Sequence, residues 1–382
     1  MRIGLNLLHV LPEVTGGWSY LDGLLAGLAA DGGDARFVAF VTPASAPLVP
    51  RGGRFETVCV RFPASVRPLR VAFENTALAA LARRHRVDTM HHFHGALPLG
   101  SAVPSVVTVY DLLVMAHPGQ FRRLTRAYLC AMLRRAARAD MLTPISHATA
   151  RDVATRLGVA PERMRVVLPV VAPRFAPRPA AEVEAFRRRR SLPPEFWLYV
   201  AYPYVHKNFA RLFAACARLR GEGRRWPLVV RSAPSPRLAG LVAGSGLGDG
   251  VVLLPPLPEE EMPLLYQAAT AFVFPSFFEG AGLPLMEAMA CGCPCAASDI
   301  PTTREFAGNS VLAFDPLDVD SIARAMAALH DSAAAREGLR AAGLARAAAF
   351  RCGSGAAAFL DAHATAAARP RASSPRLVLG TR

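Results

Sequence analysis

"FVFPSFFEGAGLPLMEAMACGCPCAASDIPTTREFAG", residues 272–308, has the pattern of a buried strand, a glycine loop and a helix. The apolar run at its start ends at Pro275 and Ser276, and Pro284 suits the first turn of a helix. Glycines in the loop allow the backbone to approach a ligand closely. Free N–H groups and the helix dipole favour an anion at such a helix start. The segment therefore predicts a phosphate site where a strand ends.

Two glutamates in this segment are candidate ligand-binding residues. Glu279 lies in the loop, and Glu287 lies eight positions later, within the expected helix. Beside a phosphate site, Glu287 could accept hydrogen bonds from ribose hydroxyls, as acidic side chains do in other nucleotide sites. The structural alternative makes Glu279 a helix cap and Glu287 a first-turn charge that stabilises the helix dipole. The strand, loop and helix context favours ligand binding.

The rest of the chain alternates short apolar runs with longer helical stretches, which is typical of parallel sheets. With 382 residues and 52% hydrophobic composition, the chain is long enough to bury two cores. We predict an α/β protein with two Rossmann-like, doubly wound domains facing a cleft. They span residues 1–172 and 173–348, and residues 349–382 form a returning helix and a disordered basic tail. The Pro-rich and Arg-rich stretch 174–196 is interpreted as a linker.

Composition narrows the function classes. A net charge of +15 indicates an acidic partner, such as nucleic acid, an anionic membrane face or a phosphorylated substrate, or else coding bias spread over solvated faces. Nucleic acid is disfavoured because the arginines are scattered through helices without interleaved aromatics. Seven cysteines without a CxxC pair argue against a disulfide scaffold or a zinc site, and Cys291, Cys293 and Cys295 are interpreted as small buried residues.

Neither a signal peptide nor an apolar run of about 18 residues is visible. We therefore expect a cytoplasmic protein that could lie at the inner membrane face.

One position stands out by residue type. Lys207 is the only lysine among the 44 lysines and arginines of the chain. A compact ammonium and a planar guanidinium differ in shape and hydration, so the exception indicates a site where arginine would not substitute.

The motif "EGAGLPLMEAMACGCP", residues 279–294, resembles the signature of the retaining GT-B glycosyltransferases of glycosyltransferase family 4. "HKNFARLFAA" and "PEVTGGWSYLDGLL" resemble two further segments of that family. The resemblance implies a GT-B fold and transfer of a sugar, a hexose in many members, from a nucleotide-sugar donor with retention at the anomeric carbon. The implied acceptor is a hydroxyl of a glycan, a polysaccharide or a lipid-linked molecule. No metal and no separate cofactor are implied, because the nucleotide-sugar is a substrate.

The resemblance also implies roles for individual residues. Glu287 would contact the donor ribose, Glu279 the donor sugar and phosphate, and Lys207 the diphosphate. The leaving phosphate would help to deprotonate the incoming hydroxyl, so that Lys207 and Glu279 act as the catalytic residues without a protein nucleophile. The full implied donor site is Gly16, Gly17, Lys207, Glu279, Gly280, Ala281, Gly282, Leu283 and Glu287.

Two positions depart from the family pattern. Tyr202 stands where many relatives have an arginine, and Tyr110-Asp111 stands where many have His-Asp. On the acceptor side we expect Tyr110, Asp111 and His94, while at least two of the three histidines in "MHHFHG" are expected to be structural. Two alternatives remain open: a sugar-nucleotide epimerase of the same fold, and a non-catalytic protein that binds sugar nucleotides or nucleic acid.

Overall fold

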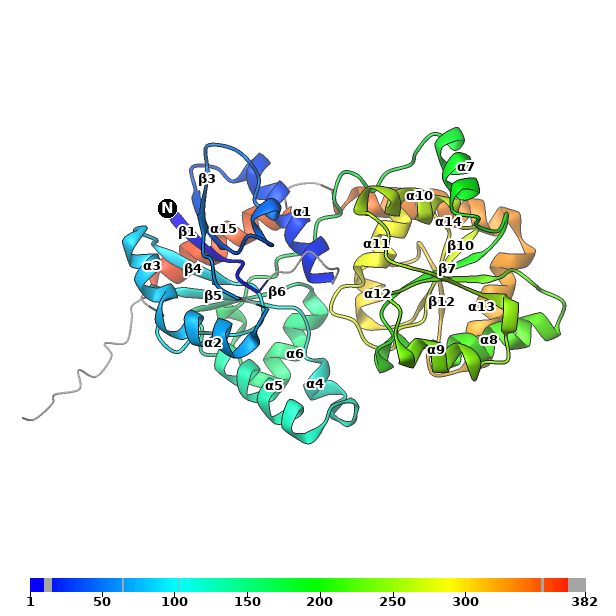
Figure 1. The fold of residues 1–382 in the computed structure, drawn as a ribbon, viewed down its shortest axis with the longest axis horizontal. Helices are drawn as coiled ribbons and strands as arrows, with labels where there is room; N and C mark the ends of the chain where they lie inside the picture. Colours follow the sequence, from blue (N-terminus) through cyan, green and yellow to red (C-terminus); the bar gives the residue numbers. More distant parts are fainter. Residues whose placement is uncertain (10–15, 64, 102, 352–353, 370–382) are drawn as a thin grey trace, which may run out of the picture.

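The computed structural model describes residues 1–9, 16–63, 65–101, 103–351 and 354–369. Figure 1 shows two α/β domains side by side, each with helices on both faces of a sheet. The sheets are parallel and six-stranded, with the orders β3-β2-β1-β4-β5-β6 and β12-β11-β10-β7-β8-β9. In both sheets the strand order switches to the other side of the first strand, between β1 and β4 and between β7 and β10. The predicted fold class is confirmed, and ligands of such sheets bind beyond these switch points.

The first sheet and its helices occupy the N-terminal part of the chain. Its strands are β1 (Arg2–Asn6), β2 (Arg36–Val41), β3 (Phe55–Cys59), β4 (Thr89–His92), β5 (Ser105–Val109) and β6 (Met141–Pro144). Its helices are α1 (Gly16–Asp31), α2 (Arg67–Thr76), α3 (Leu78–Arg84), α4 (Leu113–Ala116), α5 (Arg123–Ala136) and α6 (His147–Leu157).

The second sheet follows with the same topology. Its strands are β7 (Trp197–Val200), β8 (Leu228–Arg231), β9 (Val251–Leu254), β10 (Ala271–Phe274), β11 (Cys295–Ser298) and β12 (Leu312–Phe314). The helices are α7 (Ala180–Arg189), α8 (Phe209–Gly221), α9 (Pro236–Ala243), α10 (Met262–Ala268), α11 (Leu283–Ala290), α12 (Pro301–Phe306), α13 (Val319–Asp331), α14 (Ala333–Ala348) and α15 (Ser354–Ala368).

The central strands are buried on both faces, as their apolar sequences require. β7 and β10 are buried at every position, because helices cover both faces of a parallel sheet. Cys291, Cys293 and Cys295 are also buried in this core, at no more than 2% exposure. None of the helices in the described ranges is long and apolar enough to cross a membrane.

The linker interpretation of residues 174–196 is wrong for its middle part. Residues 180–189 form α7, whose Phe186 is fully buried against the second domain. Two of the arginines that made this stretch appear solvated are ion-paired, Arg187 with Glu184 of α7 and Arg190 with Glu261 of the second domain. The run of arginines therefore made a short amphipathic helix look like a solvated linker in the sequence.

The last described helix, α15, packs against the first sheet, on which Ala362 and Ala366 are buried (Figure 1). The His363 ring bonds to Thr89 Oγ1 at 2.8 Å and to His91 Nδ1 at 2.9 Å. Where the chain crosses between the domains, Val171 N donates to the carbonyl of Phe350 at 3.0 Å. The tail expected at residues 370–382 lies outside the described residues.

We expect acid to weaken the fold through His363. Burial lowers the pKa of His363 to about 3, so below the ordinary histidine pKa the unfolded chain binds a proton that the folded chain rejects. This single histidine should cost about 2 kcal/mol of unfolding free energy as the pH falls from about 7 to about 5. Urea denaturation at both pH values should show that His363→Gln loses less stability on acidification than the wild type. An identical loss in both proteins would contradict the assignment.

Candidate active site

The candidate site lies at the carboxyl ends of β7 and β10, where the strand order of the second sheet switches sides. The loops that follow these two strands run side by side, because Phe277 N donates to the carbonyl of His206 at 3.0 Å. The loop after β7 carries Lys207, and the loop after β10 carries Glu279. Two segments that lie about 70 residues apart in sequence are thus brought to one edge of the sheet.

Lys207 is held from its backbone. The Tyr199 hydroxyl donates to the Lys207 carbonyl at 2.5 Å. Asn208 has a positive φ of 59°, and its side-chain amide donates to the carbonyls of Pro275 and Pro316 at 3.0 and 2.7 Å. Asparagine tolerates this left-handed conformation better than most residues, so the turn aims the lysine side chain toward the neighbouring loop.

Lys207 and Glu279, the two residues predicted to be catalytic, are in direct contact. Lys207 Nζ donates to Glu279 Oε1 at 2.5 Å, and the two side chains are only 17% and 11% exposed. The Phe274 ring lies 6.0 Å from the ammonium. A buried charge is costly without a partner, and each of these two charges supplies the partner for the other.

Gly280 and Gly282 are required by geometry. A Cβ at Gly280 would lie 2.0 Å from the carbonyl oxygen of Tyr110 in the first domain. The carbonyl of Gly280 accepts a hydrogen bond from Ser146 Oγ at 2.6 Å. Gly282 has a φ of 80° and precedes α11 without offering a side-chain cap. Leu285 N and Met286 N donate to the Gly282 carbonyl and Pro284 has no N–H, so the Leu283 N–H is left for an anion at the start of α11. Ala281 and Leu283 are buried there.

Glu287 lies in the second turn of α11 and is 6% exposed. The Tyr266 hydroxyl donates to its Oε2 at 2.9 Å. Burial raises the pKa of Glu287 to about 7, although the hydrogen bond from Tyr266 opposes this shift. A buried carboxylate in the second turn does not fit the structural alternative of an exposed first-turn charge.

The first domain meets Glu287 through the start of α1. The Ser19 hydroxyl, in the first turn of α1, faces the Glu287 carboxylate and lowers its pKa. Arg174 pairs with two carboxylates: that of Asp22 of α1 at 2.6 Å and that of Glu259 of the second domain at 3.2 Å. The start of α1 therefore faces the second domain beside Glu287.

Gly16 and Gly17, which the resemblance places in the donor site, are the first two residues of α1. Backbone N–H groups there still lack intrahelical acceptors. Residues 10–15, just before them, lie outside the described residues.

Asp111 faces the ion pair from the first domain. Its Oδ1 accepts from Leu113 N at 2.8 Å. Asp111 is exposed to solvent, and partial desolvation by the surrounding protein raises its pKa. The negative charge of Glu279 raises the pKa of Asp111 further, while Lys207 lowers it. These three charges therefore belong to one electrostatic group.

Tyr110 and His94 have different surroundings. The Tyr110 ring packs edge-on against Tyr20, with centroids 5.5 Å apart, and its buried hydroxyl has no hydrogen-bond partner among the described residues. His94 stacks on His9 at 4.7 Å and lies 3.6 Å from the Glu74 carboxylate. Burial, followed by the charge of Arg70, lowers the pKa of His94 to about 4. His94 thus belongs to a polar cluster at the ends of β1 and β4.

The other two histidines of "MHHFHG" make contacts within the first domain. His91 bonds to Thr108 Oγ1 at 2.7 Å and to His363 at 2.9 Å. His92 Nδ1 lies 3.3 Å from Asn6 Nδ2. In the described ranges, no group of three or more His, Cys, Asp or Glu residues has the arrangement of a metal site.

A cavity of about 350 Å³ opens beside Glu279, between the two domains. His117 lies edge-on to Phe277 and Phe278, with centroids 5.2 and 5.4 Å apart. Arg151 and Asp152 of α6 also line the cavity. This combination of aromatic and charged side chains suits a polar ligand with apolar faces, such as a sugar.

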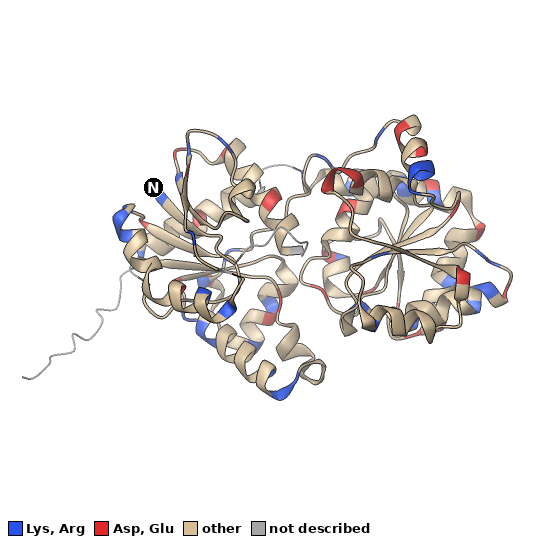
Figure 2. Ribbon diagram, in the orientation of Figure 1, with Lys and Arg blue, Asp and Glu red and all other residues tan. Residues whose placement is uncertain are grey.

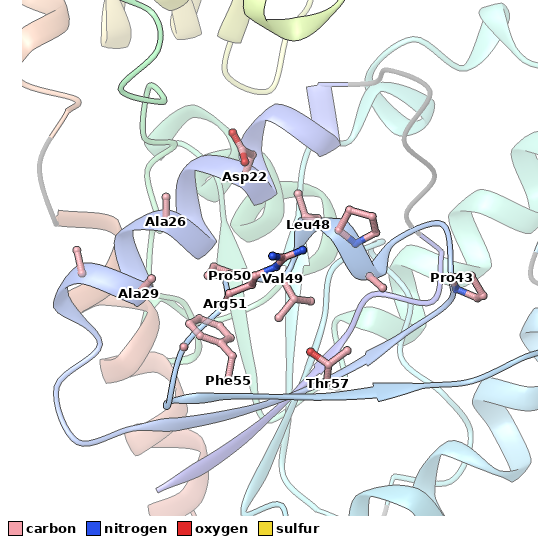
Figure 3. A pocket seen from close by; sticks show the side chains of 14 residues that line it. Asp22, Ala26, Ala29, Pro43, Leu48, Val49, Pro50, Arg51, Phe55 and Thr57 are labelled. Atoms are coloured by element: carbon pink, nitrogen blue, oxygen red, sulfur yellow. The ribbon is translucent and has the colours of Figure 1, made fainter.

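A larger hollow of about 1150 Å³ lies elsewhere on the first domain, as Figure 3 shows. It is enclosed by α1, the short helix Ala46–Leu48 and β3, and its lining is mostly alanine, proline and leucine. Asp22 and Arg51 are its only charged lining residues, and it contains none of the predicted site residues. Size alone does not identify the site in this protein.

Sequence reasoning missed Tyr199, Ser146 and Tyr266, each of which hydrogen-bonds to a site residue, and Arg174, which links Asp22 to Glu259. Their partners lie at separations of up to 152 residues, which no local pattern encodes. Asn208 had a recognisable signal, because an asparagine directly after a loop lysine favours a left-handed turn.

Two family models match the chain in succession. Residues 14–175 match "Glycosyltransferase Family 4", and residues 182–346 match "Glycosyl transferases group 1".

Curated relatives support the same assignment over part of the chain. The serotype-specific mannosyltransferase WbdA of Escherichia coli is 34% identical over 222 residues, which are 56% of this chain and 27% of that protein. A D-inositol 3-phosphate glycosyltransferase of Acidothermus cellulolyticus is 33% identical over 210 residues, which are 51% of this chain and 46% of that protein. The chain spans between about a quarter and about half of the length of these and three other curated relatives that it matches.

Solved structures share the fold over almost the whole chain. Sucrose-phosphate synthase from Thermosynechococcus elongatus has a TM-score of 0.74 at 20% identity, covering 94% of this chain and 97% of that one. Anabaena Alr3699/HepE in complex with UDP and glucose has a TM-score of 0.71 at 16% identity, covering 94% and 98%. The two family models cover the two domains in turn, and the chain therefore belongs to the GT-B glycosyltransferases of family 4.

Proposed function

We propose that the protein transfers a hexose from a nucleotide-sugar donor to an acceptor hydroxyl, with retention at the anomeric carbon. The observation that carries this proposal is the contact of Lys207 with Glu279 beside the uncapped start of α11. Relatives named as mannosyltransferases and inositol-phosphate glycosyltransferases support it. The acceptor would be a glycan, a polysaccharide or a lipid-linked molecule.

The donor diphosphate would lie where three sources of positive charge converge. These are the Lys207 ammonium, the Leu283 N–H at the start of α11, and the N–H groups of Gly16 and Gly17 at the start of α1. Glu287 would accept hydrogen bonds from the ribose hydroxyls. Because these groups supply the charge that a divalent ion provides elsewhere, we propose transfer without a metal or a cofactor, and activity should survive exhaustive chelation.

In the proposed chemistry, the acceptor oxygen attacks the anomeric carbon from the face that the diphosphate leaves. The bond between the anomeric carbon and the phosphate oxygen breaks, and the acceptor proton passes to that oxygen. Lys207 stabilises the negative charge that grows on the leaving phosphate. Glu279 holds the ammonium in place and borders the cavity from which the acceptor would enter.

A donor panel tests the proposed function directly. A specific nucleotide-sugar at saturating concentration should raise the unfolding free energy by about 2 to 4 kcal/mol. Product formation with that donor, followed by NMR of the new anomeric centre, should show retained configuration. Rearrangement of the donor without any acceptor would instead support an epimerase.

Donor binding should depend on pH through Glu287. Its pKa of about 7 means that raising the pH from about 6 to about 8 converts the neutral acid to the carboxylate that accepts ribose hydrogen bonds. Donor affinity, measured by calorimetry, should therefore rise over this range in the wild type. Glu287→Gln should bind the donor at least about tenfold more weakly, through loss of a charge-assisted hydrogen bond. A Gln variant with wild-type affinity and the same pH dependence would rule out the ribose assignment.

Lys207 should matter more for turnover than for donor binding. Removing a preorganised charge from the leaving phosphate costs about a hundredfold to a thousandfold in rate, so Lys207→Ala should lower kcat more than it raises the donor KM. Lys207→Arg keeps the charge, but it must fit a larger group into a 2.5 Å contact with Glu279, and we expect reduced kcat there too. Steady-state kinetics check both variants, and wild-type turnover by the Arg variant would refute a specific role for the ammonium.

The cavity beside Glu279 should serve the acceptor. Phe278→Ala removes one aromatic wall of this cavity, and we expect the acceptor KM to rise about tenfold through loss of about 1 to 2 kcal/mol of contact. The donor Kd should not change, which separates this effect from misfolding. If the acceptor KM stays constant while the donor Kd rises, the cavity belongs to the donor instead.

A further inference from the structure

The first domain carries an exposed face that is both apolar and basic. The described residues include ten large apolar side chains that are exposed, and five of them lie on α2, on the first turns of α5 and on the neighbouring loop. They are Val66, Leu69, Leu99, Leu124 and Tyr128, with exposures of 46, 50, 72, 87 and 44%. We call these residues, together with the arginines named below, the α2–α5 face.

The α2–α5 face is one continuous surface. The Arg67 guanidinium of α2 lies over the Tyr128 ring of α5, 4.4 Å from its centroid. Leu99 N donates to Asn75 Oδ1 of α2 at 2.5 Å, which joins the loop to the same surface. Figure 1 shows α2 and α5 as neighbours on the side of the first sheet.

The charge on this face has one sign. Arg67 lies on α2, and Arg122, Arg123 and Arg126 lie at the start of α5. The sequence has no Asp or Glu from residue 57 to 73 or from residue 112 to 139. Blue segments mark α2 and α5 in Figure 2.

The arginines of this face are not neutralised by carboxylates. Elsewhere Arg187, Arg224 and Arg304 do pair with carboxylates. None of the four arginines on the α2–α5 face makes an ion pair with a described carboxylate. Residues 122–128 are exposed at every position, so two turns of helix project both apolar and cationic side chains into solvent. A scatter of arginines through coding bias does not explain the exposed leucines beside them.

We propose that the α2–α5 face docks on an anionic lipid bilayer. Unpaired arginines match the negative surface of such a membrane, and exposed leucines gain by entering its interfacial region. A nucleic acid would satisfy the arginines but would give Leu69, Leu99 and Leu124 no apolar environment. The two kinds of side chain together therefore favour lipid, and the proposal does not depend on the proposed sugar transfer.

The test is co-sedimentation of the full-length protein with vesicles of phosphatidylcholine alone or mixed with phosphatidylserine. Each arginine near an anionic surface contributes about a fivefold factor to partitioning. The triple variant Arg122→Gln/Arg123→Gln/Arg126→Gln should therefore bind the mixed vesicles about a hundredfold more weakly. Its matched control, Arg225→Gln/Arg237→Gln/Arg324→Gln, changes three exposed arginines of the second domain and should bind like the wild type.

A second pair of variants tests the apolar half of the face. Leu69→Ser/Leu124→Ser should weaken binding to the mixed vesicles at least about tenfold, because insertion of the leucines is lost. Leu253→Ser/Leu317→Ser, also exposed but in the second domain, is its control. All four variants change exposed side chains, and unchanged thermal unfolding checks that they fold.

These binding experiments distinguish a lipid bilayer from a polyanion as the partner of the α2–α5 face. Loss of binding in both test variants and in neither control supports docking on lipid. Equal losses in the two arginine triples would show an effect of net charge alone and would overturn the proposal. Loss in the arginine triple without loss in the leucine pair, accompanied by tight binding of double-stranded DNA, would assign the face to a polyanion instead. The proposal is also overturned if the wild-type protein does not bind the mixed vesicles.

Discussion

The contact between Lys207 and Glu279 depends on the parallel architecture of the second sheet. In a parallel sheet the loops that follow the strands all begin at the same edge. The loops after β7 and β10 therefore lie next to each other there. At that meeting point both charges are largely buried, and each would be costly without the other. Tyr199 and Asn208 fix the lysine, and Gly280 and Gly282 shape the opposing loop. The remaining candidate residues are arranged around this pair.

The first domain completes this site through polar contacts. Ser146 donates to the carbonyl of Gly280, and the Glu305 carboxylate accepts from the N–H groups of His147 and Ala148, at 2.7 and 2.8 Å, at the start of α6. Arg174 joins both domains on the Glu287 side. The loop that carries Glu279 is therefore held between the two domains, which explains why donor-side and acceptor-side groups share one electrostatic environment.

The sequence predicted features that are encoded locally. The strand, glycine loop and helix of residues 272–308 could be recognised because proline, glycine and apolar spacing each constrain the backbone. Tyr266 was missed because its hydroxyl serves Glu287 only after α10 and α11 have packed. The stretch 174–196 was misread because ion pairs neutralise arginines that look solvated in sequence. His94 was placed beside the acceptor on strand position alone, and its structural neighbours are His9 and Glu74.

The ion pair also gives a physical reason for the single lysine. Arginines elsewhere in the chain bind carboxylates with two nitrogens, as in the pair of Arg304 with Asp299 at 2.5 and 2.8 Å. An arginine at position 207 could bind the Glu279 carboxylate with two nitrogens in the same way. The lysine ammonium has three donors and makes one described hydrogen bond, to Glu279. It therefore keeps donors for a phosphate while Glu279 holds it in place, and the compact ammonium needs less space beside the buried carboxylate than a planar guanidinium would.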